Sequence, residues 1–331
     1  MQRNAPLRMA PPAPSGTAAA EIPLDRVELE PEPMPEWGVK GHALVHSEAM
    51  RALPAGMPDF FLKAADRVTA LASHPDRWKI RELPHLRDSS RPDHWLSCED
   101  LEGHSLPQDR YGYILMIDRE GLAEPGRQPQ ALGTLPYQVA EMYQQLVAEF
   151  ALWRNEMERS GSEAPSTLQY QENAIYVAGV TGHYIGDAAQ PLHTTIHFDG
   201  WSSKAENPRG YRTRSGLHRE FETLLVNNAV TAEAVRQKMG PCRRLEGDPL
   251  DWATSLVREA HDQVERLYRL EQEGQLDPAQ PGPRGVDFAA ERIAQGAQKL
   301  RDLFYSAWLD SEEVARRIGE HDPQQEFLLA R

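Results

Sequence analysis

The chain has 331 residues, of which 40% are hydrophobic and 26% are charged, proportions that are typical of a folded globular protein. Its 50 acidic side chains outnumber its 36 lysines and arginines, which gives a formal net charge of −14. Because nonspecific binding of phosphate backbones needs a basic surface, this charge argues against a generic nucleic-acid coat protein. An enzyme that engages phosphates through bound cations is still compatible with it, since the cations reverse the local field.

Cysteine content and hydropathy add three expectations. The two cysteines, Cys98 and Cys242, are too few for a disulfide framework, and we expect two free buried thiols. No stretch of about eighteen consecutive apolar residues is present, so we expect no transmembrane helix. The N-terminus lacks the continuous apolar core of a secretory signal, so export is not visible in the sequence.

The hydrophobic pattern predicts an all-α fold. Residues 1–36 are rich in Pro, Ala and Glu without a hydrophobic period, which predicts a disordered leader, and residues 37–331 are predicted to form one mostly helical domain with long irregular loops. Apolar residues at helical spacing predict helices over roughly 42–53, 57–73, 136–158, 170–189, 216–227, 249–271 and 286–318. Between them we expect a long irregular excursion over 74–135, with Tyr111–Ile117 as its one strand candidate, and a second loop over about 198–215.

Three candidate metal ligands lie in the first third of the chain. His42 begins an apolar helix and closes the motif Trp37-Gly-Val-Lys-Gly-His. Asp76 follows a proline, and His94 lies in the stretch Arg-Pro-Asp-His-Trp. Taken singly, a histidine at a helix start is more often a polar cap, and an aspartate after proline is more often a turn residue.

The most informative motif is Gly182-His-Tyr-Ile-Gly-Asp-Ala-Ala-Gln-Pro-Leu-His193. His183 and Asp187 are four residues apart, so they project from one face of a helix about one turn apart. Pro191 marks the point where this helix can no longer continue, and His193 follows just beyond it. Two imidazoles and a carboxylate that converge at a helix end suit a zinc ion. A buried histidine bonded to a carboxylate would explain His183 and Asp187 alone.

A second pair with the same spacing is His218 and Glu222. It lies beside the apolar stripe that the segment's hydrophobic residues form, namely Leu217, Phe221, Leu224 and Leu225. An ionised glutamate next to a core is costly unless it is paired or bound to a metal. The two motifs together therefore favour a metal site over two unrelated buried pairs.

The ordered set of candidates resembles the family of bacterial zinc-dependent phospholipases C and fungal single-strand-specific nucleases of the S-one/P-one type. The resemblance covers nearly all of residues 37–310, and its highly specific part is the His-Asp-His segment with its Gln-Pro-Leu-His ending. It implies a helical fold that holds three zinc ions, and it implies export, as in relatives. The Trp-Gly-x-x-Gly-His opening is similar to the nuclease branch, whereas Glu222 is similar to the phospholipase branch.

The resemblance also implies a ligand set. One zinc would take Asp76, His94, His183 and Asp187; a second would take His193, His218 and Glu222; the third would take His42, Asp187 and the backbone of Trp37. Asp187 would thus bridge two ions. Asp88 and Asp93 are alternatives to Asp76, and His197 is expected outside the inner shell.

The implied activity is hydrolysis of a phosphodiester by a metal-bridging hydroxide, with Asp76 as the residue that orients the nucleophile. We expect a nuclease-like enzyme, acting on single-stranded nucleic acid or a nucleotide 3′-phosphate, because of the opening motif and of aromatic residues that can stack on bases, namely Trp95, Tyr184, Phe198 and Trp201. The alternative substrate is a phospholipid. Two others are a purely structural zinc site, which would need four protein ligands, and a non-catalytic zinc-bound interaction module. A di-iron bundle would need Glu-x-x-His pairs, which the candidate set lacks.

Overall fold

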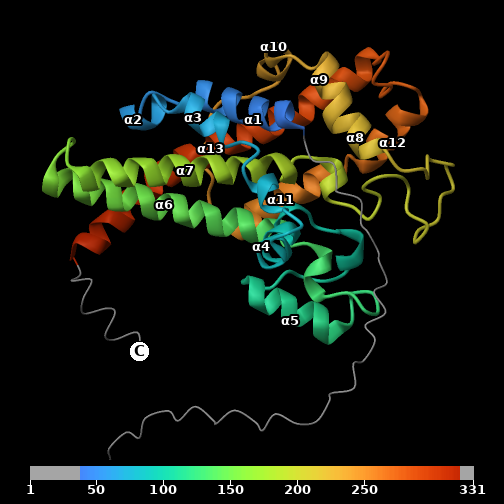
Figure 1. Ribbon diagram of the computed structural model, residues 1–331, viewed down its shortest axis with the longest axis horizontal. Coiled ribbons are helices and arrows are strands. Elements are labelled where there is room, and N and C mark those ends of the chain that lie inside the picture. Colours follow the sequence, from blue (N-terminus) through green and yellow to red (C-terminus); the bar gives the residue numbers. More distant parts are fainter. Residues whose placement is uncertain (1–37, 321–331) are drawn as a thin grey trace, which may run out of the picture. The chain divides into compact units, whose positions relative to one another are not determined.

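The computed structural model describes residues 38–320, which form a bundle of long helices with shorter helices packed around it (Figure 1). The predicted leader 1–36, Trp37 and residues 321–331 lie outside the described residues. Within 38–320 the structure contains no strand, only an isolated bridge between Phe198 and Gly200. The predicted all-α class is therefore confirmed. No described helix is both long and apolar enough to span a lipid bilayer.

The elements follow one another in a simple order. The α-helices are α1 (Val39–Arg51), α2 (Asp59–Leu62), α3 (Ala65–Ala70), α4 (Pro84–Ser90), α5 (Arg110–Glu120), α6 (Leu135–Ser160), α7 (Pro165–Ala188), α8 (Leu217–Arg219), α9 (Val226–Ala229), α10 (Ala232–Arg236), α11 (Pro249–His261), α12 (Val264–Gln272) and α13 (Pro283–Glu320). The 3-10 turns are η1 (Pro75–Trp78), η2 (Arg91–His94), η3 (Glu99–Leu101), η4 (Pro129–Leu132) and η5 (Pro191–His193). A π-helical turn, η6 (Glu220–Leu225), joins α8 to α9.

The centre of the bundle is the pair α6 and α7, against which α13 packs (Figure 1). The apolar positions predicted as core on α6 are buried at helical spacing: Val139, Met142, Leu146 and Phe150. Across the bundle, the ring centroids of Phe61 and Phe150 lie 5.2 Å apart, and those of Phe61 and Phe304 lie 5.3 Å apart. These edge-on aromatic contacts tie α2 to α6 and α13.

Two of the predicted helices are broken in the structure. The segment 57–73 contains α2 and α3 with a two-residue turn between them, and the segment 249–271 contains α11 and α12 with another. A short turn leaves the apolar period almost in phase, so the sequence pattern did not reveal either break. Cys98 and Cys242 are free thiols as predicted, although both are half-buried rather than buried.

The predicted strand at Tyr111–Ile117 is wrong, because this segment lies inside helix α5. The Asp109 side chain caps the helix by accepting hydrogen bonds from the backbone N–H groups of Tyr111 and Gly112. Gly121 ends the helix in the left-handed conformation, with φ of 63°. The capping residues on both sides outweigh the apolar alternation. Helix α4 is a second regular element within the predicted irregular excursion.

Glycines on α7 let α1 approach it closely. A Cβ atom on Gly182 would lie 2.3 Å from Nε2 of His46, and one on Gly186 would lie 2.8 Å from Nδ1 of His42. Both distances are shorter than non-bonded atoms allow, so α1 can occupy this position only because the two residues have no side chain. The contact stacks the ring of His42 on that of His183, with centroids 4.0 Å apart.

We expect Gly182→Ala to destabilise the protein by about 1–3 kcal/mol, because the added methyl overpacks the α1–α7 contact. This cost should exceed the gain of about 1 kcal/mol that alanine brings inside a helix. Urea unfolding followed by circular dichroism measures the difference. Gly319→Ala on α13 is the control, since its nearest neighbour would be 4.0 Å from the new Cβ. Equal stability of the two variants would contradict the close approach.

Candidate metal centre

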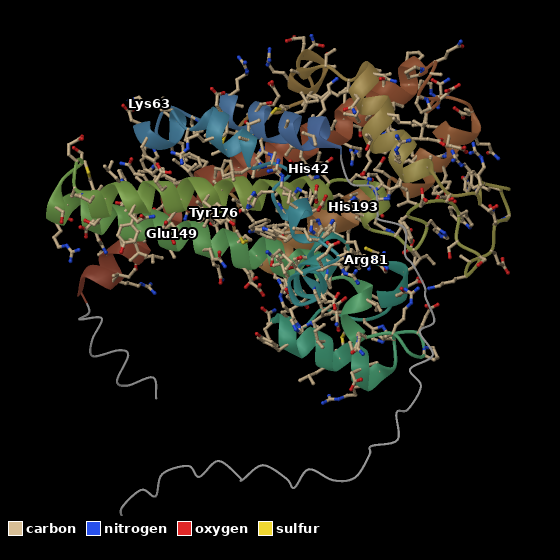
Figure 2. The ribbon with its side chains drawn as sticks, viewed as in Figure 1. His42, Lys63, Arg81, Glu149, Tyr176 and His193 are labelled. Carbon is tan, nitrogen blue, oxygen red and sulfur yellow. The ribbon has the colours of Figure 1, made fainter. Side chains whose placement is uncertain are left out.

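The structure brings together eight of the nine ligands expected from the sequence; the ninth, Trp37, lies outside the described residues. They come from seven elements: His42 from α1, Asp76 from η1, His94 from η2, His183 and Asp187 from α7, His193 from η5, His218 from α8 and Glu222 from η6. The eight residues form three groups of side chains that could hold a metal ion. Figure 2 labels His42 and His193, which lie near the same end of α7.

The first group consists of Asp76, His94 and His183, whose ligand atoms all lie within 4.8 Å of one another. Nε2 of His183 is 2.9 Å from Oδ1 of Asp76 and 3.0 Å from Nδ1 of His94. Two imidazoles and a carboxylate at this spacing match the donor set that zinc prefers. They are also three of the four ligands that the resemblance implies for one ion.

Asp187 lies between the groups. Its Oδ2 is 2.9 Å from Nδ1 of His94 and 3.2 Å from Nε2 of His183. Its Oδ1 faces the other way, 3.5 Å from Nε2 of His42 and 3.4 Å from Nδ1 of His193. Together His42, His183 and Asp187 make up the second group. One carboxylate with an oxygen toward each side has the position that a ligand bridging two ions needs.

The third group is His193, His218 and Glu222. Oε2 of Glu222 is 2.9 Å from Nε2 of His218 and 3.5 Å from Nε2 of His193. The sequence predicts His218 and Glu222 on a regular α-helix, but Glu222 lies on the π-helical turn η6. Single π-helical turns occur frequently at functional sites, where the wider turn redirects a side chain.

The buried polar atoms show that the three groups fit metal ions. Of the eight candidate ligands among the described residues, all except His183 have a buried nitrogen or oxygen without a hydrogen-bond partner. They are His42, Asp76, His94, Asp187, His193, His218 and Glu222. Buried polar atoms are otherwise nearly always paired. Nδ1 of His183 donates to the carbonyl oxygen of Ala72 at 2.8 Å, which directs the lone pair of Nε2 into the cluster. Nδ1 of His193 contacts the His94 carbonyl oxygen at 2.7 Å in the same way.

The electrostatics of the centre favour a bound cation. Burial lowers the pKa of His183, but the carboxylates of Asp76 and Asp187 raise it more, to about 10. Burial raises the pKa of Asp187, yet the imidazoles of His183 and His193 hold it well below its ordinary value. The space between these carboxylates therefore stabilises positive charge, and a metal ion supplies that charge without a proton.

Three residues at the centre were not predicted as part of it. The side-chain amide of Gln190 lies 2.9 Å from Oε2 of Glu222, and Gln190 stands inside the recognised Gln-Pro-Leu-His ending. His46 places its ring nitrogens 2.7 Å from the carbonyl oxygen of His42 and 2.9 Å from that of Gly179. Nζ of Lys79 lies 3.5 Å from Oδ1 of Asp76, and only its spacing of three residues from Asp76 could have indicated this.

The alternatives to Asp76 lie elsewhere. Oδ1 of Asp93 accepts a hydrogen bond from Oγ1 of Thr134 at 2.7 Å and pairs with Arg110. Asp88 is exposed and lies 3.3 Å from Arg87. His197, expected outside the inner shell, stacks on Trp201 with ring centroids 3.8 Å apart and belongs to none of the three groups.

The aromatic residues expected to stack on bases have different environments. Tyr184 is fully buried and packs against His94 and His183, so it cannot contact a base. Trp201 is covered on one face by His197. Trp95 is half-buried beneath the guanidinium group of Arg91, whereas Phe198 is exposed.

Comparison with known proteins gives distant similarities. No protein-family model matches the chain. A probable serine protease of Bradyrhizobium tropiciagri is 29% identical over a match that covers 45% of this chain and 22% of that protein. Two solved structures are each 14% identical and cover 81% of this chain: the alpha-toxin of Clostridium perfringens avian strain SWCP, with a TM-score of 0.33, and the alpha toxin of Clostridium absonum, with a TM-score of 0.36. The chain spans about a fifth of the curated relative and 62% and 63% of the toxins.

We expect Asp187→Asn to remove more bound zinc than Glu222→Gln, because Asp187 faces two groups and Glu222 belongs to one. Zinc per chain, measured by plasma mass spectrometry after dialysis, should fall by about one ion in Glu222→Gln, whose group keeps two histidines. Glu172→Gln, a change in an exposed ion pair with Arg67, is the control and should keep the wild-type content. Equal loss in both ligand variants would show that Asp187 does not bridge.

Proposed function

We propose that the protein is a zinc-dependent hydrolase of phosphodiester bonds. The observation that carries the proposal is the third group, in which three side chains could hold a zinc ion, so that a bound ion would keep a position for water as catalytic zinc does. A structural zinc site would be closed by four protein ligands. Zinc bound in such a centre polarises phosphoryl oxygens and lowers the pKa of a bound water to about 7.

Asp76 and Lys79 form the more exposed edge of the centre. The side chains of His42, His183, Asp187 and Glu222 have no exposed surface, whereas those of Asp76 and Lys79 are each 19% exposed. The proposed function places the approach of a substrate phosphate on this η1 side. Asp76 stays ionised there, because the neighbouring His183 outweighs the effect of burial and lowers its pKa. Its carboxylate can accept a hydrogen bond from the attacking water and orient it.

Lys79 adds a basic group at the more exposed edge of the centre. Bound zinc would offset the negative charge of Asp76, Asp187 and Glu222, and Lys79 would add positive charge beside Asp76. Burial lowers the pKa of Lys79 to about 7, although Asp187 and Glu222 act to raise it, so the group carries its charge below about pH 7. With Nζ 3.5 Å from the Asp76 carboxylate, the ammonium form is placed to bind a phosphoryl oxygen beside the oriented water.

The substrate class follows less from the centre than from its surroundings. Nuclease-like hydrolysis, which the sequence favours, needs aromatic faces for the bases. Of the four aromatic residues considered for this role, Tyr184 is in the core, and Trp201 has one face covered by His197. The phospholipid alternative needs no stacking surface.

Hydrolysis of bis(p-nitrophenyl) phosphate, a soluble phosphodiester, tests the proposal. We expect activity to disappear in a chelator and to return with zinc, and His183→Ala and Glu222→Ala to lose at least about a thousandfold in kcat/KM, because each removes a metal ligand. Full activity in the chelator would refute the proposal. Zinc binding without any hydrolysis would instead favour the interaction-module alternative.

We expect Lys79→Met to lower kcat/KM for the same substrate by about a hundredfold, as removal of one oxyanion-stabilising donor does. Lys63→Met is the matched control: Lys63 is a surface lysine 77% exposed and lies away from the centre in Figure 2. Zinc content should be unchanged in both variants. If Lys79→Met keeps its activity, Lys79 does not contact the reacting phosphate.

A further inference from the structure

Three exposed aliphatic side chains lie on the segment between two of the candidate ligands, Asp76 and His94. Seven consecutive residues, 80–86, are all exposed. They include Ile80, Leu83 and Leu86, whose exposed fractions are 44%, 49% and 40%. Within 38–320 ten large hydrophobic residues are this exposed, and three of them lie in this stretch. We call residues 80–86 the apolar collar.

The collar lies in a basic stretch of an acidic protein. Residues 77–91 contain five lysines and arginines and two acidic residues, whereas the whole chain has a net charge of −14. The guanidinium groups of Arg87 and Arg127 are close enough to Arg91 to contribute to lowering its pKa, after the effect of burial. Because charges separated by more than about 10 Å are screened at physiological salt, a nearby surface senses this local positive charge rather than the net charge.

The collar is next in sequence to residues at the edge of the metal centre. It begins directly after Lys79, whose Nζ lies 3.5 Å from Oδ1 of Asp76, and the candidate ligand His94 follows it eight residues after Leu86. In Figure 2 Arg81 lies on this segment, below His193 in the view. A surface that covers the collar would therefore lie near the more exposed edge of the centre.

We propose that the apolar collar docks the protein on a phospholipid surface that carries anionic headgroups. The docking does not require catalysis and does not depend on the proposed function. Leucine and isoleucine side chains insert among acyl chains near the headgroups, and flanking arginines bind the phosphates there. Aliphatic side chains offer no flat face for a base, so single-stranded nucleic acid fits the collar less well.

Sedimentation with vesicles of phosphatidylcholine, alone or mixed with phosphatidylglycerol, tests the docking. We expect the wild-type protein to bind the mixed vesicles more tightly, and Leu83→Ser/Leu86→Ser to lower that partition coefficient about tenfold, because two half-exposed apolar side chains are lost. Leu168→Ser is the matched control, with 43% exposure near the start of α7, nineteen residues or about 28 Å from Asp187. It should bind like the wild type.

Two further measurements separate the possible failures. Hydrolysis of bis(p-nitrophenyl) phosphate by Leu83→Ser/Leu86→Ser should equal that of the wild type, because neither leucine belongs to the metal centre. Absence of vesicle binding by the wild type, or unchanged binding by the double variant, would overturn the docking and leave the hydrolase proposal intact. Weaker binding of a single-stranded oligonucleotide by the double variant, with vesicle binding unchanged, would overturn it in favour of nucleic acid. Vesicle binding without hydrolysis of any phosphodiester would refute the proposed function alone.

Discussion

The burial of Asp187 and Glu222 among imidazoles is the constraint on which the rest of the structure depends. A carboxylate without exposed surface is costly unless positive charge compensates it. Here histidines lie beside both carboxylates. A histidine can either carry a positive charge itself or, when neutral, bind a metal ion. Nδ1 of His183 is bonded to a backbone carbonyl, and Nδ1 of His193 lies against another, so their Nε2 atoms are directed toward the carboxylates. Such a cluster is stable when it binds cations, whereas burying it in an apolar core without a cation costs free energy.

The packing of the bundle brings the segments that bear these side chains together at one end of α7. The glycines of α7 remove the side chains that would separate it from α1, which places His42 on His183. Pro191 ends the helical run so that His193 turns toward the π-helical segment that bears Glu222. The segment between Asp76 and His94 has a residue of the cluster at each end, and residues 80–86 within it are exposed.

Much of the fold follows from periodicity alone. The long amphipathic segments of α6, α7 and α13 were predicted because a helix that buries one stripe must repeat its apolar residues every three to four positions. Helix α5 differs from the predicted strand because its caps, Asp109 and Gly121, outweigh the local apolar alternation. The divided helices were missed because a turn of two residues hardly shifts the period.

The sequence by itself determined which side chains are ligand candidates, since the spacing of His183 with Asp187, and of His218 with Glu222, fixes each pair on one face of a helix. Only the tertiary structure decided which pairs meet, that Asp76 rather than Asp88 or Asp93 joins them, and that Lys79 lies beside Asp76. Spacing along a chain fixes distances over one or two turns. The approach of segments a hundred residues apart depends on the packing of the whole bundle, which no local pattern records.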